Sequence, residues 1–542
     1  MSETREHAKA DELSVTPRTS RIGSRLSHTH SGNKYEGRSL SSRITTFFPV
    51  RKQLKRVFNA CKDDDCSDIG KRQKRGNTIV GAKFKSPVEK YPETPVATEY
   101  FSEDEASTEN GVMLCCESLT NALPSALGIF DQLPPSLFLT VIEKLSVPRL
   151  VTLSLSSHEW SDRIVAYMGT ESYRNRLTRE YREFLSNRSL PYTSRDPFHT
   201  FGELLKATSV CQSTAVRISK LVTFIEKCSD TVNDFQGWGR FIHTICTKWA
   251  FTECAKVVRA VLRMDNCKIE KLIRQMIIAP YGSDSRLEMK VRRMLRGLFL
   301  DSIMIAEKLS DHGVEKEKSF WLSALLRTQL SANHQGRLFL VLFNSLEKND
   351  NGSEFINWRS LVDIAVTSWS DAEERLKPMA DALYTLLKTR KLKDGLFGWN
   401  ENEVFNMIEE ITTFPEPWSF DNFVMLLTHR PYLIPISVCA RIRHGYDDEA
   451  GSIVNSIKVL LYRWGIDIQS ILRVPLMYCM NTMNLEQRRQ LYKSIYAAHV
   501  RQFHEYLAHS DTRAGLGNLQ LEINSHAALT PVLSEMSSLL SQ

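Results

Sequence analysis

Apolar residues recur at helical spacing from about Ile129 to about Leu507, and this pattern constrains the fold more than any other feature. In one stretch, Val404 is followed by Met407, Ile408 and then Ile411. Spacings of three and four residues place such side chains on one face of an α-helix. Alternating, strand-like runs are nearly absent, and the dipeptide Asn351-Gly352 lies between helical segments. The pattern predicts an all-α body.

Breaks with turn chemistry divide this body into about a dozen or more helices. Candidate breaks are 279–283, 348–352, 414–417 and 444–445. No fixed period of a propeller or a leucine-rich repeat is present, although a helical stack resembling a solenoid remains open. We therefore expect the body to span residues 171–509. The weakly patterned stretch 510–542 is expected to be loosely ordered.

Residues 1–119 differ from the body in composition, because they are rich in Ser, Thr, Arg, Lys and Pro and have few clustered apolar residues. Such a segment cannot bury enough apolar surface to offset the entropy of ordering, so we expect a disordered tail. Residues 1–90 carry 20 Lys and Arg against 10 Asp and Glu, whereas the rest of the chain carries 50 against 53. Positive charge confined to a tail indicates an address or docking segment. It does not indicate sequence-specific nucleic-acid binding, which places a basic patch on a folded domain.

Residues 129–165 predict three short helices. Pro134 and Pro135 suit the first turn of a helix, where a missing N–H costs nothing. Pro148 suits the start of a second helix, and Ser156 with Glu159 forms a candidate capping box for a third. Helices of about ten residues are marginal alone, and a unit of about 40 residues cannot enclose this many apolar side chains. We expect the unit to need a partner surface.

The same segment resembles the F-box family, whose pattern is Leu-Pro, spaced Leu and Ile residues, a Pro-led turn and a late Trp. Ser136 and Ser156 depart from the usual residues. The resemblance implies an F-box at 120–170 that docks on a Skp-type adaptor, and through it on a cullin and a RING subunit. The implied adaptor-binding residues are Leu133, Pro134, Leu137, Ile142, Leu145, Pro148, Leu150, Leu153 and Trp160.

Beyond this box, the chain resembles the family of F-box-only protein 47, which comprises germline and meiotic F-box proteins. The likeness rests on 146–147 within the box and on 320–322, 336–338 and 399–410, followed by Pro415 and Trp418. It implies a nuclear receptor for an unidentified protein substrate, acting in meiotic progression or chromosome pairing. The alternative is a helical scaffold or chromatin-associated interaction protein, in which 129–165 closes its own core.

The tail contains three kinds of short motif. Two basic clusters indicate importin binding, so we expect the protein in the nucleus as well as in the cytoplasm. The residues of these clusters are Arg51, Lys52, Lys55, Arg56, Lys71, Arg72, Lys74 and Arg75. A candidate sliding-clamp box comprises Ile44, Phe47 and Phe48, which would share one side of a helical turn. Candidate phosphorylation sites are Thr16, Ser86, Thr94 and Ser102.

Catalytic and metal-binding motifs are not found in the sequence. The 11 cysteines are scattered, and no pair has the two-residue spacing of a zinc site. Gly-rich phosphate loops, nucleophile elbows and His-Glu-x-x-His pairs are absent as well. No stretch approaches the roughly 20 apolar residues of a membrane-spanning helix. We therefore expect a non-enzymatic protein with no metal, cofactor or membrane partner.

Overall fold

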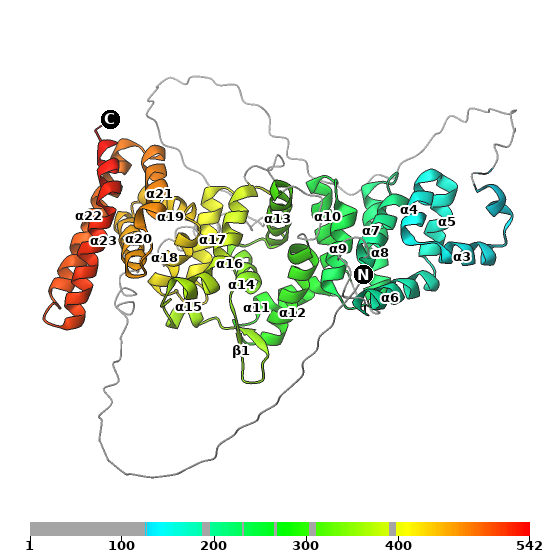
Figure 1. Ribbon diagram of the computed structural model, residues 1–542, viewed down its shortest axis with the longest axis horizontal. Coiled ribbons are helices and arrows are strands. Elements are labelled where there is room, and N and C mark those ends of the chain that lie inside the picture. The colour runs from blue at the N-terminus through cyan, green and yellow to red at the C-terminus, as the bar shows by residue number, and fades with distance from the viewer. Residues whose placement is uncertain are drawn as a thin grey trace, which may run out of the picture.

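The computed structural model describes residue 125 and residues 127–186, 196–229, 232–264, 268–302, 311–389 and 397–541. Helices dominate these residues, which confirms the predicted all-α class. The helices form an elongated stack, with α3, α4 and α5 at one end and α22 and α23 at the other (Figure 1).

The stack begins with a three-helix unit, the name used here for α3 to α5 and the 3₁₀ turn before them. Its elements are η2 (Gly128–Gln132), α3 (Pro135–Lys144), α4 (Val147–Ser156) and α5 (His158–Met168). Pro135 occupies the first turn of α3, as predicted. The N-cap of α5 is Ser157, which accepts from the Trp160 N–H, and not Ser156. Ser156 still belongs to α4, where its hydroxyl donates to the Leu153 carbonyl.

The next seven helices begin the body and frame its first half. They are α6 (Glu171–Ser186), α7 (Pro197–Thr208), α8 (Thr214–Ser229), α9 (Phe235–Cys246), α10 (Phe251–Leu262), α11 (Ile269–Ile278) and α12 (Ser285–Leu295). A π-helical turn, η3 (Arg296–Leu300), continues α12. Asp196, Asp234 and Asp284 precede α7, α9 and α12, and each side chain accepts a backbone N–H of the first turn. These caps fix where the three helices begin.

In the middle of the chain, a β-hairpin lies between two helices. The helices here are α13 (Asp311–Leu326), α14 (Ala332–Phe343), α15 (Ser360–Asp363), α16 (Trp369–Lys388) and α17 (Glu401–Thr413). Strands β1 (Leu346–Lys348) and β2 (Glu354–Ile356) pair antiparallel, with Leu346 opposite Ile356. Asn351-Gly352, which was expected between helical segments, lies in the loop of this hairpin. Gly352 has a φ of 72°, a conformation that glycine adopts readily.

Six helices complete the stack. They are α18 (Phe420–His429), α19 (Leu433–Arg443), α20 (Asp447–Arg463), α21 (Ile468–Thr482), α22 (Leu485–Leu507) and α23 (Arg513–Ser538). The expectation of a loosely ordered 510–542 is wrong for α23, which packs against α20, α21 and α22. Leu529, Val532, Leu533 and Met536 are buried there. Two glycines and Pro531 lower the helix propensity of this segment, and its contacts across the stack outweigh that loss.

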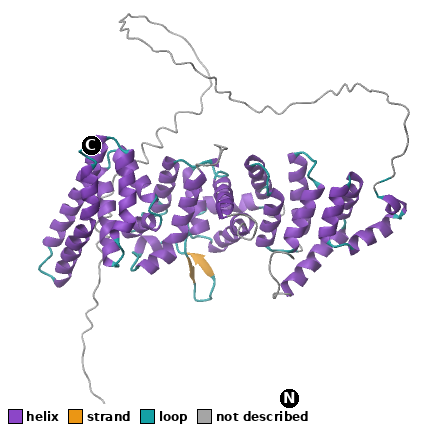
Figure 2. Cartoon of the chain, turned by 45° about the horizontal axis from the view of Figure 1, so that its top comes forward, coloured by secondary structure: helices purple, strands orange, loops and turns teal. Residues whose placement is uncertain are grey.

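In the second half of the stack, every helix except the short α15 packs on the helix two places further along the chain, up to the last two helices. Helices α14, α16, α18, α20 and α22 contact one another in sequence, and α17, α19, α21 and α23 form a second such series. Neighbouring helices stand side by side along the stack (Figure 2). One apolar core runs through both series and reaches the three-helix unit. This is the packing of a helical solenoid, in which each unit contacts its neighbours.

Candidate adaptor-docking surface

The nine residues implied as adaptor contacts divide into three groups by exposure. Pro134, Leu137 and Pro148 are exposed; Leu133, Leu145 and Leu153 are half-buried; and Ile142, Leu150 and Trp160 are buried. All nine lie in the three-helix unit, but they do not form one exposed face. The exposed and half-buried groups are available to a partner, whereas the buried group supports the unit from inside.

The buried group corrects the expectation that these helices rely on a foreign surface. Ile142 and Leu150 have no exposed area, and the Trp160 ring lies 5.5 Å from Phe130 and 5.7 Å from Phe138, between ring centroids. Helix α4 packs against α7, so the body supplies much of the surface that the unit needs. The sequence pattern could not show this, because α7 is separated from α4 by two other helices.

The first turn of α3 carries the most continuous exposed apolar surface of the unit. Residues 134–137 are all exposed, and Leu137 retains 55% of its area. The half-buried Val141 follows Leu137 by one helical turn. Two further side chains add to the exposed apolar area and are not among the implied adaptor-binding residues, Ile129 at 78% and Leu155 at 61%. Grouped exposed apolar residues of this kind mark interaction sites on soluble proteins.

Polar contacts hold the unit in position at both of its ends. Glu159 accepts hydrogen bonds from the Ser125 hydroxyl at 2.9 Å and the Leu127 N–H at 3.3 Å. On the other side, the buried Arg176 of α6 donates to the Leu145 carbonyl at 2.7 Å, which satisfies the C-terminal end of α3. Within α6, Arg176 also forms an ion pair with Glu180 at 2.7 Å. The orientation of α3 is therefore set by α5 and α6.

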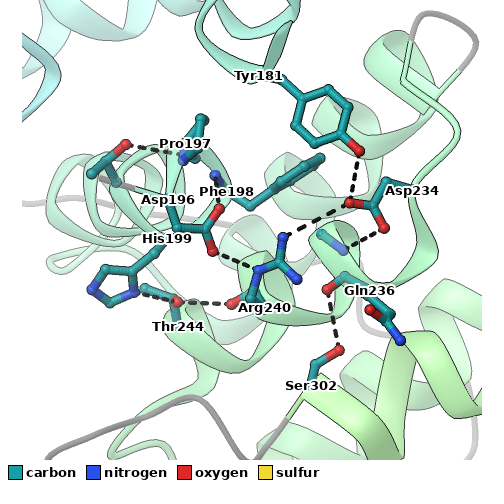
Figure 3. A network of polar contacts seen from close by, with 12 residues as sticks. Tyr181, Asp196, Pro197, Phe198, His199, Asp234, Gln236, Arg240, Thr244 and Ser302 are labelled. Carbon is teal, nitrogen blue, oxygen red and sulfur yellow. Dashed lines mark hydrogen bonds and ion pairs between the residues drawn. The ribbon is translucent and has the colours of Figure 1, made fainter. Parts of the chain in front are cut away.

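A buried ionic network joins the helices behind the unit (Figure 3). Arg240 of α9 lies 2.5 Å from Asp196, the N-cap of α7, and 3.8 Å from Asp234, the N-cap of its own helix. Tyr181 of α6 donates to Asp234 at 3.0 Å. Burial raises the pKa of Asp196, and the charge of Arg240 opposes that rise. These contacts fix α6, α7 and α9 relative to one another. Helix α7 in turn packs against α4 of the three-helix unit.

The remaining sequence-derived sites lie outside the described residues. These are the two basic clusters, the candidate clamp box and the four candidate phosphorylation sites. Within the described ranges, no group of three or more His, Cys, Asp and Glu side chains is arranged to hold a metal ion. Among the helices of those ranges, none is long and apolar enough to cross a bilayer. Among the sites predicted from the sequence, the apolar surface of the three-helix unit is the one that lies in the described residues.

The chain is similar to one protein family over the second half of its length and to two individual proteins over a little more than half. Residues 265–541 match a family described as "FBXO47, ARM repeats". The chain is 25% identical over 323 residues to human F-box only protein 47, covering 56% of this chain and 64% of that protein. The mouse protein of the same name is 25% identical over 325 residues, covering 56% and 65% respectively. The match thus spans a little under two thirds of these relatives' length. The ARM-repeat description agrees with the solenoid packing of the helices.

Proposed function

Because the chain belongs to the family of F-box only protein 47 with its ARM repeats, we propose that it is a substrate receptor of a Skp-cullin-F-box ubiquitin ligase. In this proposal the chain catalyses nothing itself. The three-helix unit binds the Skp-type adaptor, and the helical stack holds a protein substrate. The observation that carries the proposal is the exposed first turn of α3, with Leu137 at its centre.

The proposal assigns adaptor binding and substrate binding to different parts of the stack. The exposed apolar surface of α3 lies at one end of the molecule, whereas the solenoid extends away from it (Figure 1). Arg176 bonds the end of α3 to α6, and the Arg240 network joins α6 to α7 and α9, so an adaptor bound to α3 would have a defined position relative to the stack. Solenoids offer long surfaces suited to protein ligands.

Co-precipitation of the full chain with a purified Skp-type adaptor tests this proposal. Burying one leucine contributes roughly 1.5–3 kcal/mol. Leu137→Lys is therefore expected to weaken adaptor binding by about tenfold or more. The matched control is Leu516→Lys in α23, because Leu516 is 57% exposed and lies at the far end of the stack.

The control should bind the adaptor as the unchanged protein does. Retention of binding by Leu137→Lys would remove the proposed docking surface. Failure of the unchanged protein to bind any Skp-type adaptor would instead favour the alternative, a helical scaffold without ligase function.

We further propose that the protein acts in the nucleus, in meiotic progression or chromosome pairing in the germline. The support is the family resemblance and the two basic clusters of the tail, which together hold eight Lys and Arg at 51–56 and 71–75. Neutralising these eight residues in the full chain should leave a fluorescent fusion in the cytoplasm. An unchanged nuclear signal would contradict the importin assignment without affecting adaptor binding.

A further inference from the structure

A groove on the first half of the stack is not used by the proposed adaptor contact. It lies between α8 and α9 on one side, α12 on the second and the β1–β2 hairpin on the third, and has a volume of about 970 Å³. We call it the hairpin groove. Pockets for small molecules range from about 300 to 1,000 Å³, so this one is at the upper end and suits a short peptide.

The floor of the hairpin groove is apolar. Three methionines, Met264, Met289 and Met294, line it together with Trp238 and Leu298. All five side chains are at least 95% buried. Methionine is unbranched and polarisable, so it adapts to aromatic and aliphatic ligands of different shapes. The floor therefore suits an apolar side chain more than a charged one.

The rim of the groove is basic. Arg286, Lys290 and Arg293 occur at intervals of four and three residues on α12, are all exposed, and line the same groove. Lys348 of the hairpin faces it as well. Glu354 is the one acidic residue among the described lining residues, and it lies 3.7 Å from Arg293. Within the described part of the chain, Arg286 and Lys290 have no carboxylate within ion-pair distance. The groove thus offers positive charge around an apolar floor.

We propose that the hairpin groove binds the acidic segment 99–109 of the same chain. Residues 91–120 contain seven Asp and Glu and no Lys or Arg. In the middle of this run, Tyr100 and Phe101 directly precede Ser102-Glu103-Asp104-Glu105. The segment therefore pairs two aromatic side chains with a block of carboxylates, which complements the methionine floor and the basic rim.

The chain length allows this docking. Helix α4 contacts α7, α7 contacts α9, and α9 lines the groove. With about 10 Å between the axes of packed helices, the groove lies some 30 Å from the three-helix unit. Fifteen residues separate position 109 from Ser125, and an extended chain of that length reaches about 50 Å. The segment can therefore reach the groove from the start of the stack.

The docked segment would occupy the groove in competition with any acidic peptide of a substrate. A phosphate on Ser102 would add nearly two negative charges beside the basic rim. The inference goes beyond the proposed ligase function and does not require it, because both binding partners belong to one chain.

Photo-crosslinking in the full-length protein tests the inference. Phe101→p-benzoylphenylalanine keeps an aromatic ring in the segment, and the crosslinked peptides are mapped by mass spectrometry. We expect crosslinks within the monomer to residues of α12 and the hairpin loop. Arg286→Glu with Lys290→Glu should abolish them, and so should high salt, since both remove the attraction between exposed charges.

Arg489→Glu with Lys493→Glu in α22 is the matched control, because these two exposed residues have the same four-residue spacing. The control should crosslink normally. Reversing the segment as well, with Glu103→Lys, Asp104→Lys and Glu105→Lys, should restore the crosslinks lost with Arg286→Glu and Lys290→Glu.

Crosslinks that map elsewhere, that join two copies of the chain, or that survive the α12 reversals would each overturn the inference. If the variant with Arg286→Glu and Lys290→Glu fails to fold, the charge reversal of residues 103–105 alone tests the inference. That reversal should abolish the crosslinks without altering the helical body. Adaptor binding is measured on the same proteins and tests the proposed ligase function independently of the crosslinks.

Discussion

Arg240 donates a hydrogen bond of 2.5 Å to Asp196, and both side chains are buried between α7 and α9. Asp196 also caps α7 by accepting the Phe198 N–H at 3.1 Å. One carboxylate thus starts a helix and holds the neighbouring helix at the same time. The pair lies directly behind the three-helix unit, whose α4 packs on α7.

Arg240→Met should lower the free energy of unfolding by about 3–5 kcal/mol, because it leaves the Asp196 carboxylate buried without its cation. Urea denaturation of the full chain measures this loss. Adding Asp196→Asn should recover part of it, since asparagine also caps helices and carries no charge. Equal losses in the single and double variants would show that Arg240 acts through packing alone.

Ile142 and Leu137 lie in the same helix and should respond differently to truncation. Ile142 has no exposed area, so Ile142→Ala should cost about 2–5 kcal/mol of stability. Leu137→Ala should change stability by less than about 0.5 kcal/mol, because Leu137 is 55% exposed. Thermal unfolding of both variants checks the difference. Similar melting temperatures would contradict the assignment of Ile142 to the core.

Lys458 and Glu522 form a fully buried ion pair between α20 and α23, with 2.6 Å between Nζ and Oε1. Lys458→Met should destabilise the protein by about 3–5 kcal/mol, because Glu522 then loses its buried cation. Lys458→Met with Glu522→Leu should be much closer in stability to the unchanged protein. Urea denaturation followed by circular dichroism measures both. A double variant as unstable as the single one would contradict this account.

His526 should make the C-terminal helices sensitive to acid. Burial, together with the charges of His499 and Lys458, lowers the pKa of His526 from 6.5 to about 4. A histidine with a lowered pKa in the folded state stabilises the fold above pH 6.5, and this contribution is lost as pH falls toward 4. Glu522 acts in the same direction, because its bonds to His499 and Lys458 outweigh burial and hold its pKa below the usual value.

His526→Phe keeps a ring against His499, whose ring centroid is 3.7 Å away, and removes the titration. The fall in melting temperature between pH 7 and pH 4.5 should therefore be smaller in this variant. The exposed His158 of α5 provides the control, since His158→Phe should leave that fall unchanged. A fall of the same size in all three proteins would exclude His526 as its source.

The class of fold could be predicted from the sequence because helical spacing is a local signal. Residues such as Val404, Met407 and Ile408 define a helical face without reference to any other segment, and all three are buried in α17. The same reasoning placed Pro135 at the start of α3. Errors arose where contacts between distant segments decided the outcome.

Two examples show what local patterns missed. Ile142 and Leu150 were expected to face a partner, and the structure buries them because the body lies against the three-helix unit. Helix α23 was expected to be loose, and partners as distant in sequence as Lys458 hold it in place. The adaptor-binding role of Leu137 stays a prediction, which depends on family resemblance as well as on spacing; the side chain is exposed.

The regular contact of each helix with the second one after it makes the length of this molecule additive. Removing one α-helical pair from the second half would bring the two ends of the helical stack closer by about 10 Å, a single helix diameter. The number of helical repeats therefore determines the length of the stack. It sets how far a protein held near α22 and α23 stands from whatever is attached to α3.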